Sequence, residues 1–223
     1  MFIISEAVDT ITTTQLIRDN ETIVSSGGSF ELGFFSPSSS KNRYLGIWYK
    51  TITIRTVVWV ANRETPIANA SGVLKITNPG ILVLFHGTSN MIWSSNTSRS
   101  VQNPIAQLLD SGNFVVRNAN DDNPQNFLWQ SFDYPGDTLL PDMKLGRNLL
   151  TGLDWYLMDT RGYPQLIVSN VTAETYRTGP WNGLRLSGTL NLKQNTIFEF
   201  NFTFNEEEVY YGYELLNSAV ISR

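Results

Sequence analysis

The stretch that decides the fold is LLDSGNFVVR, residues 108–117, near the middle of the chain. A polar Asp-Ser-Gly-Asn turn leads into an apolar run rich in aromatic and β-branched residues, which predicts a turn followed by a β-strand. A similar unit, NPGILVLF (residues 78–85), lies upstream. A tryptophan follows each unit, Trp129 in the first case and Trp93 in the second, so the stretch belongs to an internal repeat.

The repeat has a third copy. Trp59 in VVWVAN, Trp93 in MIWSSN and Trp129 in FLWQSF have matching contexts, 34 and 36 residues apart. GGSFELGFF (residues 27–35) is the loose counterpart of the turn-plus-strand unit before Trp59, with a hairpin-loop insertion, SPSSSKN, behind it. A unit this short cannot bury its own apolar face. We therefore expect the three copies to pack around a shared axis, with the tryptophans as structural core residues at the centre.

Strand signals dominate elsewhere too, while helical periodicity is absent, so the chain is predicted to be all-β. In IFEFNFTF (residues 197–204) every second residue is Phe, a period of two that predicts one buried face. The segment 131–152 is turn-rich and irregular, and a domain boundary is placed near Gly152. Asn205 to Val209, NEEEV, is interpreted as a solvated hairpin tip.

Composition excludes several function classes. The formal net charge of −4 gives no basic surface for nucleic acid, and the absence of cysteine removes disulfides and thiol chemistry. Residues 1–7 are expected to be the remnant of a signal peptide or disordered. No apolar run reaches the length of a membrane span, so none is expected.

Catalytic groups are sparse. The single histidine, His86, has no evident nucleophile or orienting partner in the sequence. Asp133, Asp137 and Asp142 do not have the spacing of a calcium-binding loop. A paired-carboxylate glycosidase using Asp133 or Asp137 stays open as a remote alternative. We expect no catalytic residue, no metal site and no cofactor.

Five Asn-x-Ser/Thr sequons lie beside predicted turns and are candidates for N-glycosylation in a secretory compartment. They are at Asn20, Asn69, Asn96, Asn170 and Asn201.

Six ordered blocks carry a family resemblance: GGSFELGFFSP, YLGIWYK, VVWVANRETPI, LLDSGNFVVRN, LWQSFDYPGDTLLPDMKLG and YRTGPWNGLRLSG. Together they resemble the ectodomain of plant S-locus glycoproteins and S-domain (G-type lectin) receptor-like kinases. The resemblance implies a bulb-type, mannose-lectin-like β-prism of three four-stranded sheets with pseudo-threefold symmetry at residues 8–152. It also implies part of a second lectin-like module, the S-locus glycoprotein module, at residues 153–223. The family's cysteine-rich, membrane and kinase regions would lie outside this chain, which resembles a truncated member.

The resemblance further implies an extracellular recognition module, in the best-known branch for recognition of pollen, linked to signalling. Its partner would be an extracellular peptide, protein or glycan, with a receptor homo- or heterodimer as a further expectation. The chain itself would carry no catalysis.

Bulb-type lectins bind mannose through a Gln-x-Asp-x-Asn-x-Val-x-Tyr strand, whose alternating side chains form one row. Alignment on the Gly-Asn turn places Leu109 and Ser111 at the Gln and Asp positions. Asn113 and Val115 match the motif, whereas Arg117 replaces Tyr.

The second repeat matches the motif only at Val83, and the first shows no recognisable match. The candidate carbohydrate site is therefore a degenerate one, Ser111, Asn113, Val115 and Arg117, and a working mannose-binding lectin is the alternative function.

Overall fold

The computed structural model describes residues 8–169, 174–193 and 195–217. The expectations for residues 1–7 and for Asn170 lie outside these residues. The chain divides into two compact units. The first comprises residues up to Ser131 together with Gly136–Thr138, and the second comprises Phe132–Pro135 and the residues from Leu139 onward. The predicted domain ranges 8–152 and 153–223 stay a prediction.

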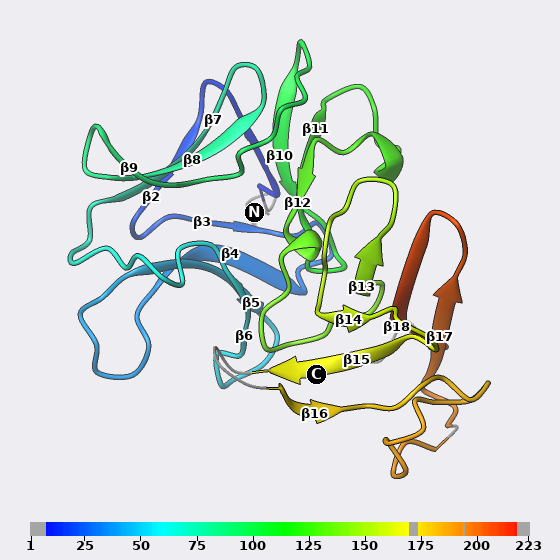
Figure 1. Cartoon of the computed structure of the whole chain (residues 1–223). Coiled ribbons are helices and arrows are strands. Elements are labelled where there is room, and N and C mark those ends of the chain that lie inside the picture. The colour runs from blue at the N-terminus through cyan, green and yellow to red at the C-terminus, as the bar shows by residue number, and fades with distance from the viewer. Residues whose placement is uncertain (1–7, 170–173, 194, 218–223) are drawn as a thin grey trace. The chain divides into compact units, whose positions relative to one another are not determined.

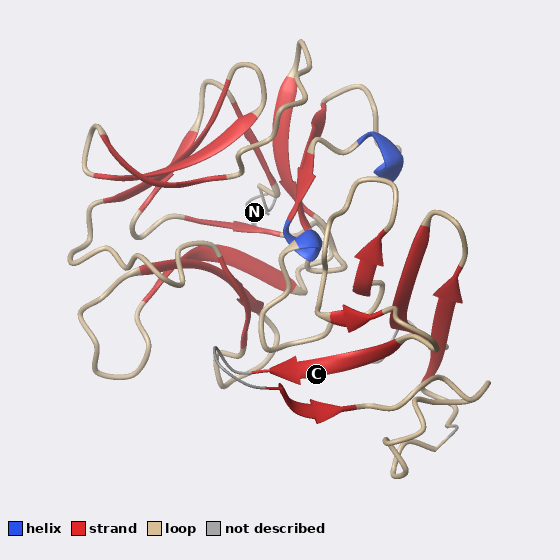
Figure 2. Cartoon of the chain, in the orientation of Figure 1, coloured by secondary structure: helices blue, strands red, loops and turns tan. Residues whose placement is uncertain are grey.

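The first unit consists of three antiparallel four-stranded sheets (Figures 1 and 2), which confirms the predicted all-β prism. One sheet has the order β3-β4-β5-β6, with β3 Thr22–Val24, β4 Phe30–Phe35, β5 Tyr44–Tyr49 and β6 Val57–Val60. The next has the order β2-β7-β8-β9, with β2 Leu16–Arg18, β7 Gly72–Thr77, β8 Ile81–His86 and β9 Asn90–Ser94. The last has the order β1-β10-β11-β12, with β1 Thr10–Thr12, β10 Pro104–Leu108, β11 Phe114–Asn118 and β12 Trp129–Gln130.

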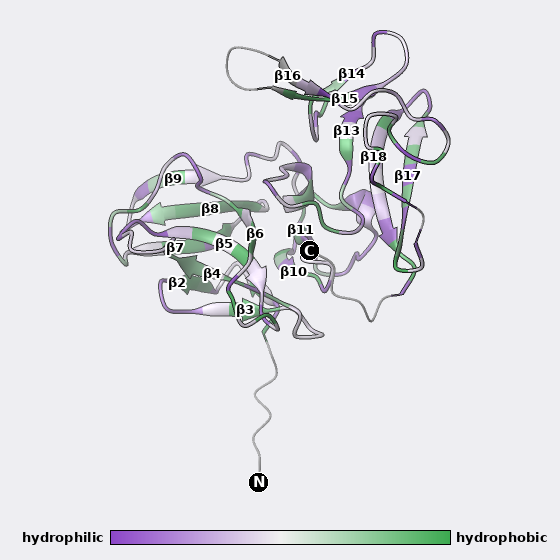
Figure 3. Ribbon diagram, turned by 90° about the horizontal axis from the view of Figure 1, so that it is seen from below, coloured by the Kyte–Doolittle hydropathy of each residue, from purple (hydrophilic) through white to green (hydrophobic). Residues whose placement is uncertain are grey.

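The order of the strands ties the three sheets into one body. Each sheet takes three consecutive strands from the later chain and one of the short strands β1, β2 and β3 as an edge strand. The first three strands of the chain therefore enter three different sheets. Apolar residues fill the inner strands of these sheets. Strand β8 is largely hydrophobic in Figure 3, and Leu45, Ile47, Leu82 and Leu84 have no exposed surface.

Three equivalent hydrogen bonds define the repeat at the level of single residues. The Leu45 backbone N–H donates to Asn62 Oδ1 at 2.9 Å, the Leu82 N–H to Ser95 Oγ at 3.0 Å, and the Phe114 N–H to Ser131 Oγ at 2.9 Å. Each acceptor lies just past a repeat tryptophan and satisfies a buried donor near the start of the preceding strand. Strands β5, β8 and β11 are therefore equivalent.

This equivalence corrects one prediction. GGSFELGFF leads into β4, the first strand of its triplet, and is not the counterpart of the units before Trp93 and Trp129. The true counterpart is β5, which carries YLGIWY. The two apolar strands before Trp59 look alike in sequence, and only their hydrogen bonding tells them apart.

The three repeat tryptophans lie together at the centre of the first unit. Their ring centroids are 5.7–6.1 Å apart and all three pairs meet edge to face, at interplanar angles of 67–76°. Phe114 adds another edge-to-face contact with Trp129. This arrangement suits the quadrupoles of aromatic rings and joins one strand of each sheet at a single point.

The second unit contains two three-stranded antiparallel sheets. One has the order β13-β18-β17, with β13 Leu145–Asn148, β17 Phe198–Phe204 and β18 Glu208–Leu215. The other has the order β14-β15-β16, with β14 Met158–Asp159, β15 Gln165–Ser169 and β16 Glu174–Arg177. A cluster of Met158, Leu166, Leu186, Val209 and Tyr211 forms an apolar core in this unit.

Two predictions for this region were incomplete. Strand β13 falls in the segment that was expected to be irregular, because its pairing partner β18 lies far away in sequence. The phenylalanine row of β17 is buried only in part: Phe200 and Phe202 pack on the apolar core, whereas Phe204, at the end of this edge strand, is 62% exposed.

Candidate functional site

The residues of the degenerate mannose motif do not form a row along one strand. Residues 109–113 make the turn between β10 and β11, closed by the Leu109 N–H bond to the Asn113 carbonyl at 2.9 Å. Gly112 has φ +84°, a conformation that favours glycine. Only Val115 and Arg117 lie on β11. The expected row was wrong in this respect, because the chain reverses direction within it.

Asn113 and Val115 are both buried, at 6% and 0% exposure. The Asn113 amide nitrogen donates to Gln130 Oε1 at 2.9 Å, and its oxygen accepts from the Ser131 hydroxyl at 3.2 Å. Ser111 Oγ accepts the Asn113 backbone N–H at 3.3 Å. These side chains are engaged in holding the turn against β12.

Arg117 spreads over the outer face of its sheet. Its Nε and Nη2 donate to Gln107 Oε1 at 3.0 and 2.8 Å, and Gln107 in turn donates to Asp9 Oδ2 at 2.9 Å. Its Nη1 donates to the backbone carbonyls of Asn118, Ala119 and Asp121 at 3.0–3.3 Å. The position at which mannose lectins carry a tyrosine is thus occupied by a guanidinium whose three nitrogens all donate hydrogen bonds within the chain.

The equivalent position can be found in the other two sheets. Arg117 lies three residues after Phe114, so its counterparts lie three residues after Leu82 and Leu45; they are Phe85 and Trp48. The Lys75 ammonium lies 4.8 Å from the Phe85 ring centroid, and the Arg55 guanidinium lies 4.8 Å from the Trp48 ring. At each of the three positions there is thus either a cationic side chain, Arg117, or an aromatic ring with a cationic side chain over it.

Trp48 is also held by hydrogen bonding. Its indole N–H donates to Glu31 Oε2 at 3.0 Å, and the Thr22 hydroxyl donates to Glu31 Oε1 at 2.8 Å. Trp48 is only 5% exposed beneath Arg55. Sequence reasoning missed this position because the first repeat has no Gly-Asn turn on which to align it. A better signal was the polar residue past each repeat tryptophan.

The three aspartates considered as catalytic or metal-binding candidates have different surroundings. Asp133 Oδ1 accepts the Trp155 indole N–H at 2.8 Å in the second unit, and Asp137 lines a cleft in the first unit. Asp142 is a turn residue with φ +67°. His86 is the last residue of β8 and pairs with Asn90. Within the described ranges, no group of three or more His, Asp or Glu side chains could hold a metal ion.

The sequons differ in exposure. Asn20, Asn69 and Asn96 are exposed, and Asn20 and Asn96 have positive φ values in turns. Asn201 lies within β17, where its amide nitrogen donates to Glu214 and its oxygen is buried. No helix in the described part of the chain has the length and apolar character needed to cross a membrane.

Comparisons with known proteins match a family model to each of two parts of the chain. A family model for the D-mannose binding lectin matches residues 56–161, and one for the S-locus glycoprotein domain matches residues 176–223. The S-locus-specific glycoprotein S6 of Brassica oleracea is 42% identical over 97% of this chain and 54% of its own length. The receptor-like serine/threonine-protein kinase SD1-8 of Arabidopsis thaliana is 43% identical over 93% of this chain and 26% of its own length.

The chain thus spans about half the length of the first of these relatives and about a quarter of the second. Among solved structures, a monomeric mannose-binding lectin from Gastrodia elata aligns with 55% of this chain and 96% of its own, with a TM-score of 0.41 and 20% identity.

Proposed function

We infer that this chain, a member of the S-locus glycoprotein and G-type lectin S-receptor-like kinase family, is an extracellular recognition module that does not use the mannose motif of its fold. Its ligand is a peptide, protein or glycan bound elsewhere on the surface, and binding serves cell signalling, with recognition of pollen as one such role. Dimerisation with another receptor ectodomain is part of the proposal. The chain itself supplies no catalysis.

One observation carries the proposal: at the equivalent position of each sheet, one of the chain's own cationic side chains occupies the position or lies over the ring there. A mannose ring at the β10–β11 face would have to displace Arg117 from Gln107 and from three backbone carbonyls. It would gain little in return, because Asn113 is already bonded to Gln130 and Ser131. Exchanging satisfied internal hydrogen bonds for sugar hydroxyls brings almost no net free energy in a solvent-exposed site.

The test is a mannose titration of the secreted chain by isothermal calorimetry, together with a glycan array. We expect no saturable mannose binding. Asn113→Ala and the control Asn42→Ala, an exposed asparagine in the loop between β4 and β5, are titrated beside the unchanged chain. Circular dichroism verifies that Asn113→Ala is folded, because this side chain also holds the turn.

Tight mannose binding that disappears in a folded Asn113→Ala and persists in Asn42→Ala would overturn the proposal and establish a working mannose lectin. The glycosidase hypothesis has a separate test. It requires hydrolysis of a glycoside that is lost when Asp133 or Asp137 is changed to Asn.

Secretion has a consequence for the sequons. We propose that Asn20, Asn69 and Asn96 carry N-glycans, because their exposed turns can enter an oligosaccharyltransferase. Asn201 would be occupied far less, since its side chain is bonded to Glu214 within a strand. Peptide mapping after enzymatic deglycosylation measures the occupancy of each site, and an occupied Asn201 with empty loop sites would contradict the assignment.

A further inference from the structure

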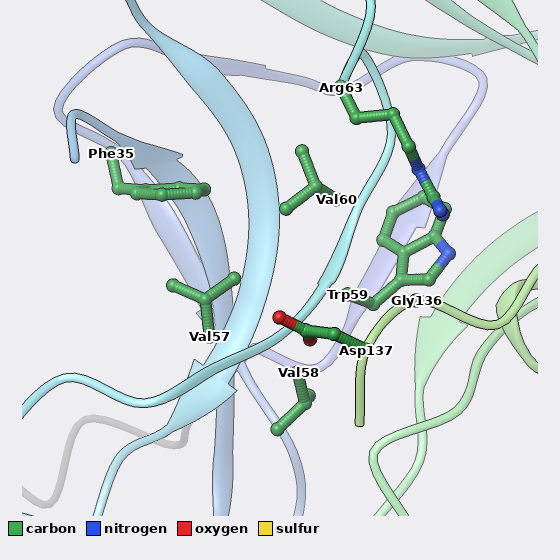
Figure 4. Close-up of a pocket in the computed structure, with 8 residues that line it drawn as sticks. All are labelled: Phe35, Val57, Val58, Trp59, Val60, Arg63, Gly136 and Asp137. Atoms are coloured by element: carbon green, nitrogen blue, oxygen red, sulfur yellow. The ribbon is translucent and has the colours of Figure 1, made fainter. Parts of the chain in front are cut away.

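A cleft lies beside β6 in the first unit, and its lining residues are different from those of the mannose motif. It has a volume of about 340 Å³ and is lined by Phe35, Val57, Val58, Trp59, Val60, Arg63, Gly136 and Asp137 (Figure 4). This volume is at the small end of the range for ligand pockets. All of the lining residues belong to the first unit.

The walls of the cleft are mostly apolar. Val57 and Val60 are half-buried on β6, whereas Phe35 and Trp59 are buried at 7% and 6% exposure. Phe35 is fixed in place because Gly46 leaves room for its ring: a Cβ added at Gly46 would lie 2.6 Å from the Phe35 side chain. The apolar wall is therefore built on rigid strands and is preformed.

Asp137 brings a negative charge to this apolar surface. Figure 4 shows its carboxylate directed across the cleft, toward the side that carries Val57 and Phe35. Its Oδ1 accepts the Thr138 hydroxyl at 3.1 Å. In the part of the chain that the structure describes, no lysine or arginine lies within ion-pair distance of this carboxylate. Apolar walls with one carboxylate complement a ligand that has an aliphatic stem and a cationic end.

We propose that this cleft binds the side chain of a lysine or arginine from a peptide or protein ligand. The methylene stem lies against Val57, Val60 and Phe35, and the cationic end pairs with Asp137. Long basic side chains pack their stems on apolar surface and keep the charge at the rim in this manner. The proposal rests on the proposed recognition function and names the chemistry of its ligand.

The cleft offers few polar groups to a ligand. Arg63 lies beside the Trp59 indole in Figure 4. A sugar is a poorer fit, because a pyranose presents several hydroxyl groups and the side chains lining this cleft offer few polar atoms, those of Asp137, Arg63 and the Trp59 indole nitrogen.

The experiment uses the full chain and four capped tripeptides whose central residue is Lys, Arg, norleucine or Glu. Binding is measured by calorimetry at about 50 and about 500 mM salt, because an ion pair at an open rim is screened by salt. We expect the Lys and Arg peptides to bind about tenfold more tightly than norleucine at low salt, because only they bring a cation to the Asp137 carboxylate. The Glu peptide should not bind.

Variants locate the site. Asp137→Asn should weaken the Lys and Arg peptides about tenfold, and Asp137→Lys should abolish their binding and give measurable binding of the Glu peptide. The matched control is Asp122→Asn, an exposed aspartate after β11, which removes the same charge and should change affinity less than about twofold.

Failure of the basic peptides to bind, or equal binding by norleucine, overturns the inference. So does binding of methyl mannoside that depends on Asp137. None of these outcomes decides the proposed function, because that is tested separately through Asn113 and mannose.

Discussion

Inside the first unit, Trp59, Trp93 and Trp129 meet at nearly equal spacings, while the equivalent points on its outer faces hold a tryptophan, a phenylalanine and an arginine. The interior retains the threefold repeat because close packing penalises any change of volume there. An outer face is constrained much less, and its side chains can change without unfolding the sheet. The fold is therefore held by the part that repeats, and binding chemistry must be sought in the part that does not.

The largest effect is expected from Trp129→Ala, which tests whether the repeated interior holds the fold. Trp129 is 5% exposed and contacts Trp59, Trp93 and Phe114, so its removal leaves a cavity where three sheets meet. We expect a loss of about 3–5 kcal/mol in the free energy of unfolding. Urea unfolding followed by far-UV circular dichroism measures it. Phe85→Ala, the control at a half-buried position on an outer face, should cost less, and equal costs would contradict the division into interior and surface.

A second interior test concerns the hydrogen bonds that define the repeat. Ser131→Ala removes the acceptor of the buried Phe114 N–H, and Ser95→Ala does the same for Leu82. An unsatisfied buried donor costs about 1–3 kcal/mol, and we expect this loss for each variant. Hydrogen exchange measured by mass spectrometry should show faster exchange in β11 for the first variant and in β8 for the second. Unchanged exchange in both strands would show that these bonds do not hold the repeat.

The arrangement of the interior could also be predicted from the sequence. Apolar strands bounded by turns, together with three evenly spaced tryptophans, were enough to predict an all-β domain in which three copies of a repeat surround a central aromatic cluster, and the family resemblance implied the β-prism. The counterpart of LLDSGNFVVR before Trp59 was assigned to the wrong strand, because β4 and β5 are both apolar and differ only in their partners. The bonds that identify the right strand join Leu45, Leu82 and Phe114 to the residues Asn62, Ser95 and Ser131, and they are seen only in the structure.

The outer faces could not be predicted in the same way. Arg117 was recognised as a replacement for tyrosine, yet its contact with Gln107 depends on the register of β10 against β11. The contacts of Lys75 with Phe85 and of Arg55 with Trp48 likewise join residues on different elements, whose pairing no local pattern specifies. The cleft at Asp137 joins β6 to a segment far along the chain. Sites formed by residues on different elements can be located only from the structure.

The first outer-face test is Arg117→Met, which keeps the aliphatic stem and removes the guanidinium. Its hydrogen bonds to Gln107 and to three carbonyls are lost, but water can replace them at this half-buried position. We therefore expect a loss of about 1 kcal/mol in the free energy of unfolding, less than for Ser131→Ala. Urea unfolding checks this order, and a larger loss for Arg117→Met would mean that the outer face is part of the structural core.

The smallest effect is expected from Arg55→Met on the first sheet. Arg55 is exposed and contacts the Trp48 ring without a hydrogen bond or ion pair among the described residues, so an exposed cation–π contact of about 0.5–1 kcal/mol is all that is lost. The informative readout is quenching of tryptophan fluorescence by acrylamide, because Trp48 becomes more accessible while Trp59, Trp93 and Trp129 stay buried or half-buried. Lys75→Met, which uncovers Phe85 and no tryptophan, is the matched control and should leave quenching unchanged. Equal quenching in Arg55→Met and the unchanged chain would mean that Arg55 does not cover the indole, and the three outer faces would then differ in cover as well as in residue type.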